Sequence, residues 1–213
     1  MKQLRSPALT LGEIVETWLP ARVGAIDDML WILDLSDQFG RDIEIQLHIK
    51  DGPAFNSSLS LLSGPMLAAG YVHARALLEF IGISAKDGAL IQVQRRRPSD
   101  LAIEHYSIDG KNLEKVPLDE VYASINMPRT VVDWALVTVI EYANKFFAHV
   151  TTGEVLTMAL DHQVRIALRG ISMLVHNNLF AKLGRAEPVL VATQPIYSCN
   201  SCRSSQSKQD GSS

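Results

Sequence analysis

Cysteine is almost missing from this chain, which has only two in 213 residues, Cys199 and Cys202. A fold held together by disulfides is therefore excluded. The pair forms a single Cys-x-x-Cys in a polar C-terminal stretch, and it supplies two ligands where a structural zinc ion needs four. We interpret it as two ordinary thiols, with a zinc ion shared between two chains, or redox chemistry, as the alternatives. No metal site and no cofactor are expected.

Long apolar runs and a strong net charge are also missing. No apolar run approaches the roughly 20 residues that cross a bilayer, and the first seven residues lack the continuous apolar stretch of a secretory signal. We therefore expect a cytoplasmic protein with no membrane partner. The formal net charge is −3 and the pI is near 6.1, so any binding of nucleic acid must depend on a local basic patch.

Common catalytic signatures are absent too. The sequence contains no Gly-rich phosphate loop, no Gly-x-Ser-x-Gly elbow and no His-Glu-x-x-His helix. Because these patterns mark nucleotide-binding enzymes, serine hydrolases and zinc proteases, no local motif assigns the chain to those classes. Function must instead be sought in polar residues scattered over apolar helices.

Apolar side chains in helical spacing are what the chain does have. Hydrophobic residues make up 47% of it, enough for one domain with a sizeable core. We predict a mainly α fold, an antiparallel helical bundle of four to five main helices in a single domain over residues 1–190. Residues 191–213 become rich in Ser and Gln and cannot bury enough apolar surface, which predicts a disordered tail.

Helix boundaries follow from capping patterns, prolines and apolar periodicity. Thr10 and Glu13 form a capping box that opens a short helix ending near Pro20. Pro65 is suited to the first turn of a helix that runs to about Ile81. The remaining helices are predicted at residues 21–38, 118–125, 129–149 and 153–183.

Two segments are harder to assign. Residues 42–50 alternate apolar and polar side chains, which is a strand signature, yet Ile43 and Leu47 could also continue the preceding helix. We interpret this segment as helical because its neighbours are helical and no partner strand is evident. Residues 83–117 lose periodicity around an Asp109-Gly110 turn, and predict an irregular insertion on the rim of the domain with at most a short hairpin.

A polar stripe interrupts the most apolar helix of the chain. Glu141, Lys145 and His149 are spaced four apart and so share one side of it. A cation beside an imidazole lowers its pKa, which suits a general base. His149 with Lys145, beside Asn144, is therefore a candidate catalytic group. The stripe is also typical of the single wet or interfacial side of a buried helix, and we prefer that interpretation.

Other candidates are cationic residues that precede this helix. Arg75 and Glu79 are one helical turn apart and can form an ion pair, which would fix how two helices dock if it were buried. His73 lies on a different face and is typical of a hydrogen-bonded interface residue. Three consecutive arginines carry the most concentrated positive charge, which either binds phosphate or RNA or is simply exposed. The residues that could contact RNA or a partner are His73, Arg75, Arg95, Arg96 and Arg97.

Two stretches resemble motifs of a known family. His-Ala-Arg-Ala-Leu-Leu-Glu-Phe at 73–80 and Asn-Lys-Phe-Phe-Ala-His at 144–149, separated by an Arg-rich insertion, are similar to an uncharacterised group of HEPN-like bacterial helical proteins. The resemblance implies a helical bundle, frequently a homodimer. In active members an Arg, then a polar residue, then a His a few positions on, form a metal-independent ribonuclease site across the dimer. Here Asn144 stands where that Arg is expected, although Lys145 and His149 match, and Asn cannot supply the charge that stabilises a developing phosphorane.

The resemblance and the residues together give a functional expectation. We expect an HEPN-like domain that self-associates as a homodimer and binds a protein or RNA partner without catalysis. The alternative is a metal-independent ribonuclease, toxin-like or defence-related, that uses His149. Both hypotheses require the helices that carry residues 73 and 149 to lie side by side.

Overall fold

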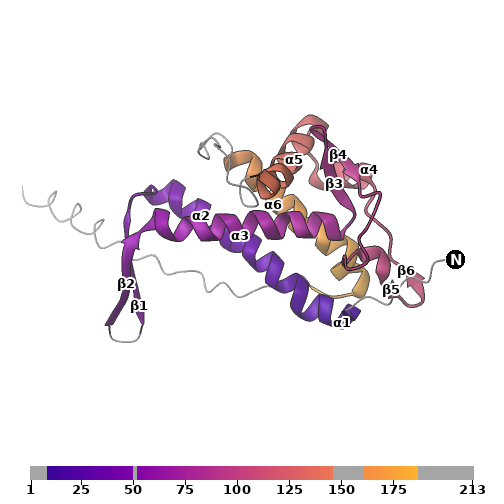
Figure 1. Ribbon diagram of the computed structural model, residues 1–213, viewed down its shortest axis with the longest axis horizontal. Coiled ribbons are helices and arrows are strands. Elements are labelled where there is room, and N and C mark those ends of the chain that lie inside the picture. The colour runs from indigo at the N-terminus through magenta and orange to yellow at the C-terminus, as the bar shows by residue number, and fades with distance from the viewer. Residues whose placement is uncertain (1–8, 50–51, 146–160, 187–213) are drawn as a thin grey trace, which may run out of the picture.

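The computed structural model describes residues 9–49, 52–145 and 161–186, and in this part the chain is mainly helical, as predicted (Figure 1). The predicted disordered tail at 191–213 lies outside the described residues. Among the residues described, we find no helix whose length and apolar content would suffice to span a bilayer. The elements in chain order are α1 (Leu11–Glu13), η1 (Ile14–Trp18), α2 (Leu19–Phe39), β1 (Glu44–Ile49), β2 (Gly52–Ser58), α3 (Leu59–Phe80), β3 (Ile83–Lys86), β4 (Ala89–Gln92), η2 (Ile103–His105), β5 (Ser107–Ile108), β6 (Lys111–Asn112), α4 (Leu118–Ile125), α5 (Arg129–Lys145), α6 (Asp161–Val175), η4 (His176–Phe180) and η5 (Ala181–Leu183).

The N-terminal helix does not end at Pro20, so that prediction is wrong. Thr10 and Glu13 form the predicted capping box, in which Thr10 Oγ1 accepts from the Glu13 N–H at 3.2 Å and Glu13 Oε2 accepts from the Thr10 N–H at 2.8 Å. The helix then passes through the π turn η1 into α2, with Pro20 in the first turn of α2. Because Pro20 has no N–H to donate, the wider turn, closed by the Leu19 N–H on the Ile14 carbonyl, lets the helix continue.

Residues 44–49 form strand β1, so the helical interpretation of 42–50 is wrong. β1 pairs antiparallel with β2, in a register that sets Glu44 opposite Ser58 and Ile45 opposite Ser57. The alternation in the sequence was therefore a true strand signal, and its partner strand lies in the Ser-rich stretch that follows. The β1–β2 hairpin projects from one end of the pair of long helices α2 and α3 (Figure 1).

α3 begins at Leu59, six residues before the proline predicted to open it. Pro65 removes one N–H, which would otherwise donate to the carbonyl of Leu61, and both residues lie on an exposed side of the helix where water can replace that bond. α3 packs on α2 at Gly70, where an added Cβ would lie 2.5 Å from the Cβ of Met29. The absence of a side chain at Gly70 therefore sets how closely the two helices approach.

The insertion at 83–117 contains two short antiparallel hairpins, β3–β4 and β5–β6, one more than predicted, and the chain between them is irregular apart from η2. Asp109 and Gly110 both have positive φ, 52° and 76°, and make the predicted turn between β5 and β6. The two hairpins are not joined to each other or to β1–β2. The chain therefore has no extensive sheet among the described residues, and the bundle remains the main architecture.

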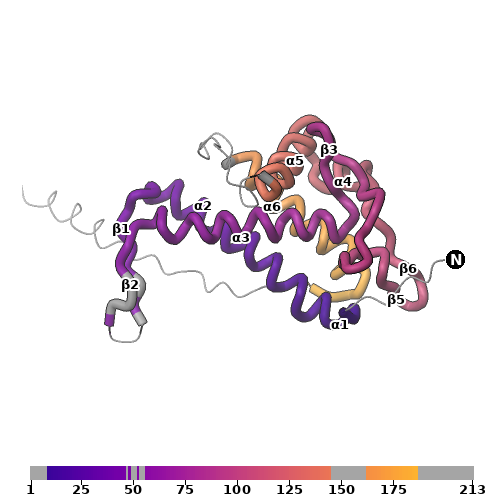
Figure 2. Tube along the Cα trace, viewed as in Figure 1, coloured from indigo at the N-terminus to yellow at the C-terminus, as the bar shows by residue number. Residues whose placement is uncertain are grey.

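The main core lies where α2, α3, α5 and α6 meet, and each contributes fully buried side chains, such as Met29, Leu77, Leu136 and Leu168. Figure 2 shows the long course of α2 and α3, with α5 and α6 gathered along one part of it. Arg165 at the start of α6 contacts two aspartates near the end of α2, and the chain after α6 returns to η1. α6 therefore runs antiparallel to α2, as expected for the bundle.

Candidate functional site

The helices that carry the two sequence motifs are in contact. Tyr71 on α3 is buried and stacks on Tyr142 of α5, with 5.6 Å between ring centroids and 19° between planes. Asn144, two residues further on, is half-buried in the last turn of α5. His149 and the side chain of Lys145 lie outside the described residues. The proposed catalytic group therefore stays a prediction.

His73 faces away from α5 and lies near enough to Arg22 of α2 to be affected by its charge. Residues two positions apart on a helix point about 200° away from each other. Because Tyr71 points toward α5, His73 points away from it. The His73 side chain is half-buried, and its Nδ1 is buried with no hydrogen-bond partner. Burial lowers the pKa of His73, and the positive charge of Arg22 on α2 lowers the pKa further. The imidazole is therefore held in its neutral form beside a permanent cation.

Arg22, which was not predicted from the sequence, lies near His73. Its guanidinium carbon lies 3.7 Å from the centroid of the Trp18 ring, one helical turn earlier. Its Nε is buried and has no acceptor, and burial lowers the pKa of Arg22. Among the residues that the structure describes, no carboxylate forms an ion pair with Arg22. We call Arg22 and His73, with Trp18, the α2–α3 polar seam.

The sequence offered a signal for this seam that the predicted helix boundary hid. Trp18 and Arg22 are four residues apart, the spacing at which two side chains meet on one helix. The predicted break at Pro20 placed them in different helices. Once η1 carries the helix past Pro20, the two residues share one face.

Arg75 is already paired within its own helix. Its Nε and Nη2 donate to Glu79 Oε1 at 3.1 and 3.0 Å. The two side chains are 36% and 40% exposed, so the pair is a surface pair that adds little stability. Arg75 is therefore not a spare cation for a phosphate.

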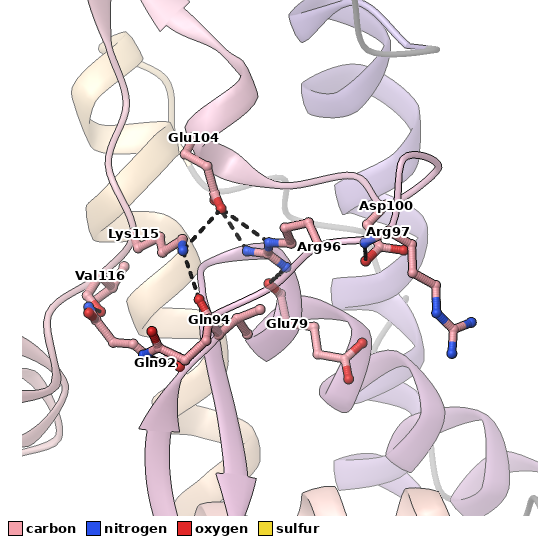
Figure 3. A network of polar contacts seen from close by, with 10 residues as sticks. Glu79, Gln92, Gln94, Arg96, Arg97, Asp100, Glu104, Lys115 and Val116 are labelled. Carbon is pink, nitrogen blue, oxygen red and sulfur yellow. Dashed lines mark hydrogen bonds and ion pairs between the residues drawn. The ribbon is translucent and has the colours of Figure 1, made fainter. Parts of the chain in front are cut away.

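Arg96 faces inward and holds the insertion to α3 (Figure 3). Its side chain is only 13% exposed, donates to both carboxylate oxygens of Glu104 at 3.1 and 3.2 Å, and also donates to the carbonyl of Glu79. Lys115 Nζ lies 3.7 Å from the same carboxylate and donates to the Val93 carbonyl at 2.7 Å. A cation at the carbonyl end of a helix is favoured by the helix dipole. Arg96 is thus a structural residue.

The other two arginines of the predicted basic patch face solvent. Arg95 and Arg97 are exposed, and in the described part of the chain neither side chain forms an ion pair. The backbone N–H of Arg97 donates to Asp100 at 2.7 Å and fixes the turn (Figure 3). The structure therefore leaves two free cations where the sequence predicted three.

Two hollows in the described surface lie away from the predicted residues. One lies between the β5–β6 hairpin and Lys182, and another lies between β4 and the start of α4. Neither is lined by a residue of the predicted site. Within residues 9–49, 52–145 and 161–186, no three His, Cys, Asp or Glu side chains gather closely enough to hold a metal ion.

Comparison of the chain with protein-family models, with curated proteins and with solved structures found no match. The functional argument therefore depends on the residues and contacts described above.

Proposed function

We propose that this chain is a non-catalytic, HEPN-like helical domain that self-associates through the outer face of α3. The outer face consists of Leu61, Leu62, Pro65, Ala69 and Val72, which recur at helical spacing on one side of the helix. The observation that carries the proposal is the exposure of its three largest aliphatic side chains. Leu61, Leu62 and Val72 are 60%, 36% and 46% exposed.

The composition of α3 strengthens this argument. From Leu59 to Val72 the helix contains no charged residue, although part of this stretch faces solvent. A solvent-facing helix surface normally carries charged side chains. Covering an exposed leucine or valine fully is worth about 1.5–3 kcal/mol, and clustered exposed apolar side chains mark interaction surfaces.

A second copy of the chain fits this face through twofold symmetry. In an antiparallel pair of α3 helices, Leu61 of one copy would meet Val72 of the other, and the reverse contact would follow from the symmetry. The middle of the face carries the small Ala69 and the compact Pro65, which allow two helices to approach closely. Because the large side chains lie at both ends and the small ones between them, the face presents the same pattern to a second copy related by twofold rotation.

Protein is a better-supported partner than RNA. RNA binding relies on clustered unpaired cations, but Arg75 is paired with Glu79 and Arg96 with Glu104. Arg95 and Arg97 remain exposed, in a chain of net charge −3. The ribonuclease alternative depends on His149, which lies outside the described residues, and no described contact favours it.

Measurement of mass across a concentration range tests the proposal. Light scattering behind size exclusion should report a species of twice the 23.5 kDa chain mass that dissociates on dilution. Leu61→Glu buries two carboxylates per dimer without partners, so we expect at least about a hundredfold weaker association. Met127→Glu changes an exposed apolar residue outside α3, and should leave the association unchanged.

Three outcomes would overturn this assignment. One is a wild-type chain that stays monomeric at every concentration. A second is equal weakening by Leu61→Glu and Met127→Glu, because the effect would then not belong to α3. A third is copurifying RNA, seen as a high absorbance ratio and lost with Arg95→Gln plus Arg97→Gln, while Leu61→Glu has no effect on mass. Circular dichroism of each variant checks that the helices are retained.

A further inference from the structure

We propose that Arg22 and His73 form a binding site for a single oxyanion, a phosphate or a carboxylate group, at the α2–α3 polar seam. This site is separate from the outer face of α3 and stands independently of self-association. No sequence motif assigns it, because its two members come from different helices.

The first argument is unbalanced charge. A guanidinium is always protonated and carries five N–H donors. In the described part of the chain no carboxylate pairs with Arg22 and no acceptor takes a hydrogen bond from it. By contrast Arg75, Arg96 and Arg165 each pair with an acidic side chain. A half-buried cation without a partner is costly, and a bound anion would remove that cost.

The second argument is orientation. The Trp18 ring lies 3.7 Å from the guanidinium carbon and covers one flat side of it. Trp18 is itself held by Phe80 of α3, with 5.4 Å between the ring centroids. The guanidinium is thereby fixed in direction, and its N–H edges remain for a planar or tetrahedral oxyanion, which Arg binds through two parallel hydrogen bonds.

The third argument is the neighbouring imidazole. His73 Nδ1 is buried and has no partner, which is uncommon for a polar atom in a folded protein. A neutral imidazole offers one N–H donor beside the guanidinium. Burial is the larger cause of the lowered pKa of His73 and the charge of Arg22 the smaller one, and an oxyanion held by Arg22 would offset the smaller one. The guanidinium therefore selects an anion over a cation, and the imidazole can add one N–H donor.

Calorimetric titration of the full chain tests the site, with inorganic phosphate in one arm and acetate in the other, at ionic strength held constant with chloride. We expect saturable binding in at least one arm, and the arm that saturates identifies the oxyanion. Arg22→Gln should weaken binding at least about tenfold. Arg22→Lys keeps the charge but loses the planar fork, and should weaken it by a smaller factor. The matched control, Arg97→Gln, removes the same charge from an exposed position and should leave the affinity unchanged.

A second readout follows the proposed contact itself. The imidazole nitrogen resonances of His73, assigned with His73→Gln, should shift on titration of the wild type and of Arg97→Gln, and stay fixed in Arg22→Gln. No saturation in either arm overturns the proposal. Equal loss in Arg97→Gln and Arg22→Gln overturns it as well, because binding would then reflect general charge. If Arg22→Gln fails to fold, unchanged affinity in Arg22→Lys together with a fixed His73 resonance contradicts the site.

Discussion

At the scale of single residues, Gly70 controls how α3 packs on α2. A Cβ added there would lie 2.4 Å from the sulfur and 2.5 Å from the Cβ of Met29. Rotation of the methionine thioether cannot relieve the second contact, because the Cβ is fixed by the backbone. We therefore expect Gly70→Ala to lower the free energy of unfolding by about 1–3 kcal/mol, measured by urea denaturation.

Gly64 provides the matched control on the same helix, because a Cβ added there meets nothing within 4 Å. Gly64→Ala should raise the free energy of unfolding by about 0.5–1 kcal/mol, since alanine loses less backbone entropy in a helix than glycine. Stabilisation by both substitutions would mean that the two helices can separate at Gly70 without cost.

His73 makes the stability of the fold depend on pH. Burial and the charge of Arg22 lower its pKa in the folded chain, whereas the unfolded chain keeps the ordinary value of about 6.5. The unfolded state therefore takes up a proton first as the pH falls. The contribution of His73 to the free energy of unfolding is complete above about pH 6.5. It is lost as the pH falls through the lower pKa that His73 has in the folded chain.

We expect His73→Gln to reduce the loss of melting temperature between pH 7 and pH 5. His162→Gln, on an exposed position of α6, should keep the wild-type pH dependence. Thermal melts of the three proteins across this range make the comparison. Identical pH dependence in His73→Gln and the wild type would contradict a buried neutral imidazole.

At the scale of elements, the Arg96–Glu104 pair fastens the insertion to the end of α3. The side chains are 13% and 22% exposed, so removing one partner leaves a largely buried charge poorly compensated. Arg96→Met should lower the free energy of unfolding by about 2–3 kcal/mol. Hydrogen exchange should show the change first at residues 83–117.

Two further variants separate this pair from a general charge effect. Arg97→Gln removes an exposed neighbouring arginine and should change the free energy of unfolding by less than about 0.5 kcal/mol. Adding Glu104→Gln to Arg96→Met should recover part of the loss, because the carboxylate, which Lys115 alone compensates poorly at 3.7 Å, is then gone. If the second substitution adds a further loss of similar size, the pair is not coupled.

Elements whose signals were local could be predicted from the sequence. The helix at Leu118–Ile125 has its predicted bounds, and the Asp109-Gly110 turn lies where expected, since its two positive φ angles suit these residues. The β1–β2 hairpin was missed because its second strand, Gly52–Ser58, lacks the apolar alternation of the first and so gave no strand signal of its own. The helix boundaries predicted at Pro20 and Pro65 were wrong. At Pro20 a π turn lets the helix continue, and at Pro65 the carbonyl that loses its N–H partner is exposed to water. Neither effect can be inferred from the proline itself.

The candidate site shows the same division. Helical spacing correctly paired Arg75 with Glu79, because both residues lie on one helix. The position of Arg22 beside His73 depends on how α2 packs on α3, and the spacing within either helix carries no information about it. Arg96 was predicted as part of a basic patch, since its acidic partner Glu104 lies eight residues away in an irregular segment.

At the scale of the whole molecule, the apolar interior has two parts of unequal size. The larger joins α2, α3, α5 and α6. The smaller contains Ile32, Leu35 and Leu59, with Ile43 and Ile45 of the hairpin region packed against it. Leu67 is partly buried against both. Because few buried side chains hold the hairpin end, we expect it to open at a lower free energy than the rest.

Hydrogen exchange on the native protein can resolve the two parts. Leu59→Ala should create a cavity in the smaller cluster and lower the free energy of unfolding by about 2–4 kcal/mol. Amides in residues 42–66 should then exchange faster, while those of α5 keep their wild-type rates. Leu77→Ala, in the larger core, should accelerate exchange in both regions. If Leu59→Ala raises the exchange rates in α5 as much as those in the hairpin, the fold opens as one cooperative unit, and the outer face of α3 would then be anchored along its whole length by the main core.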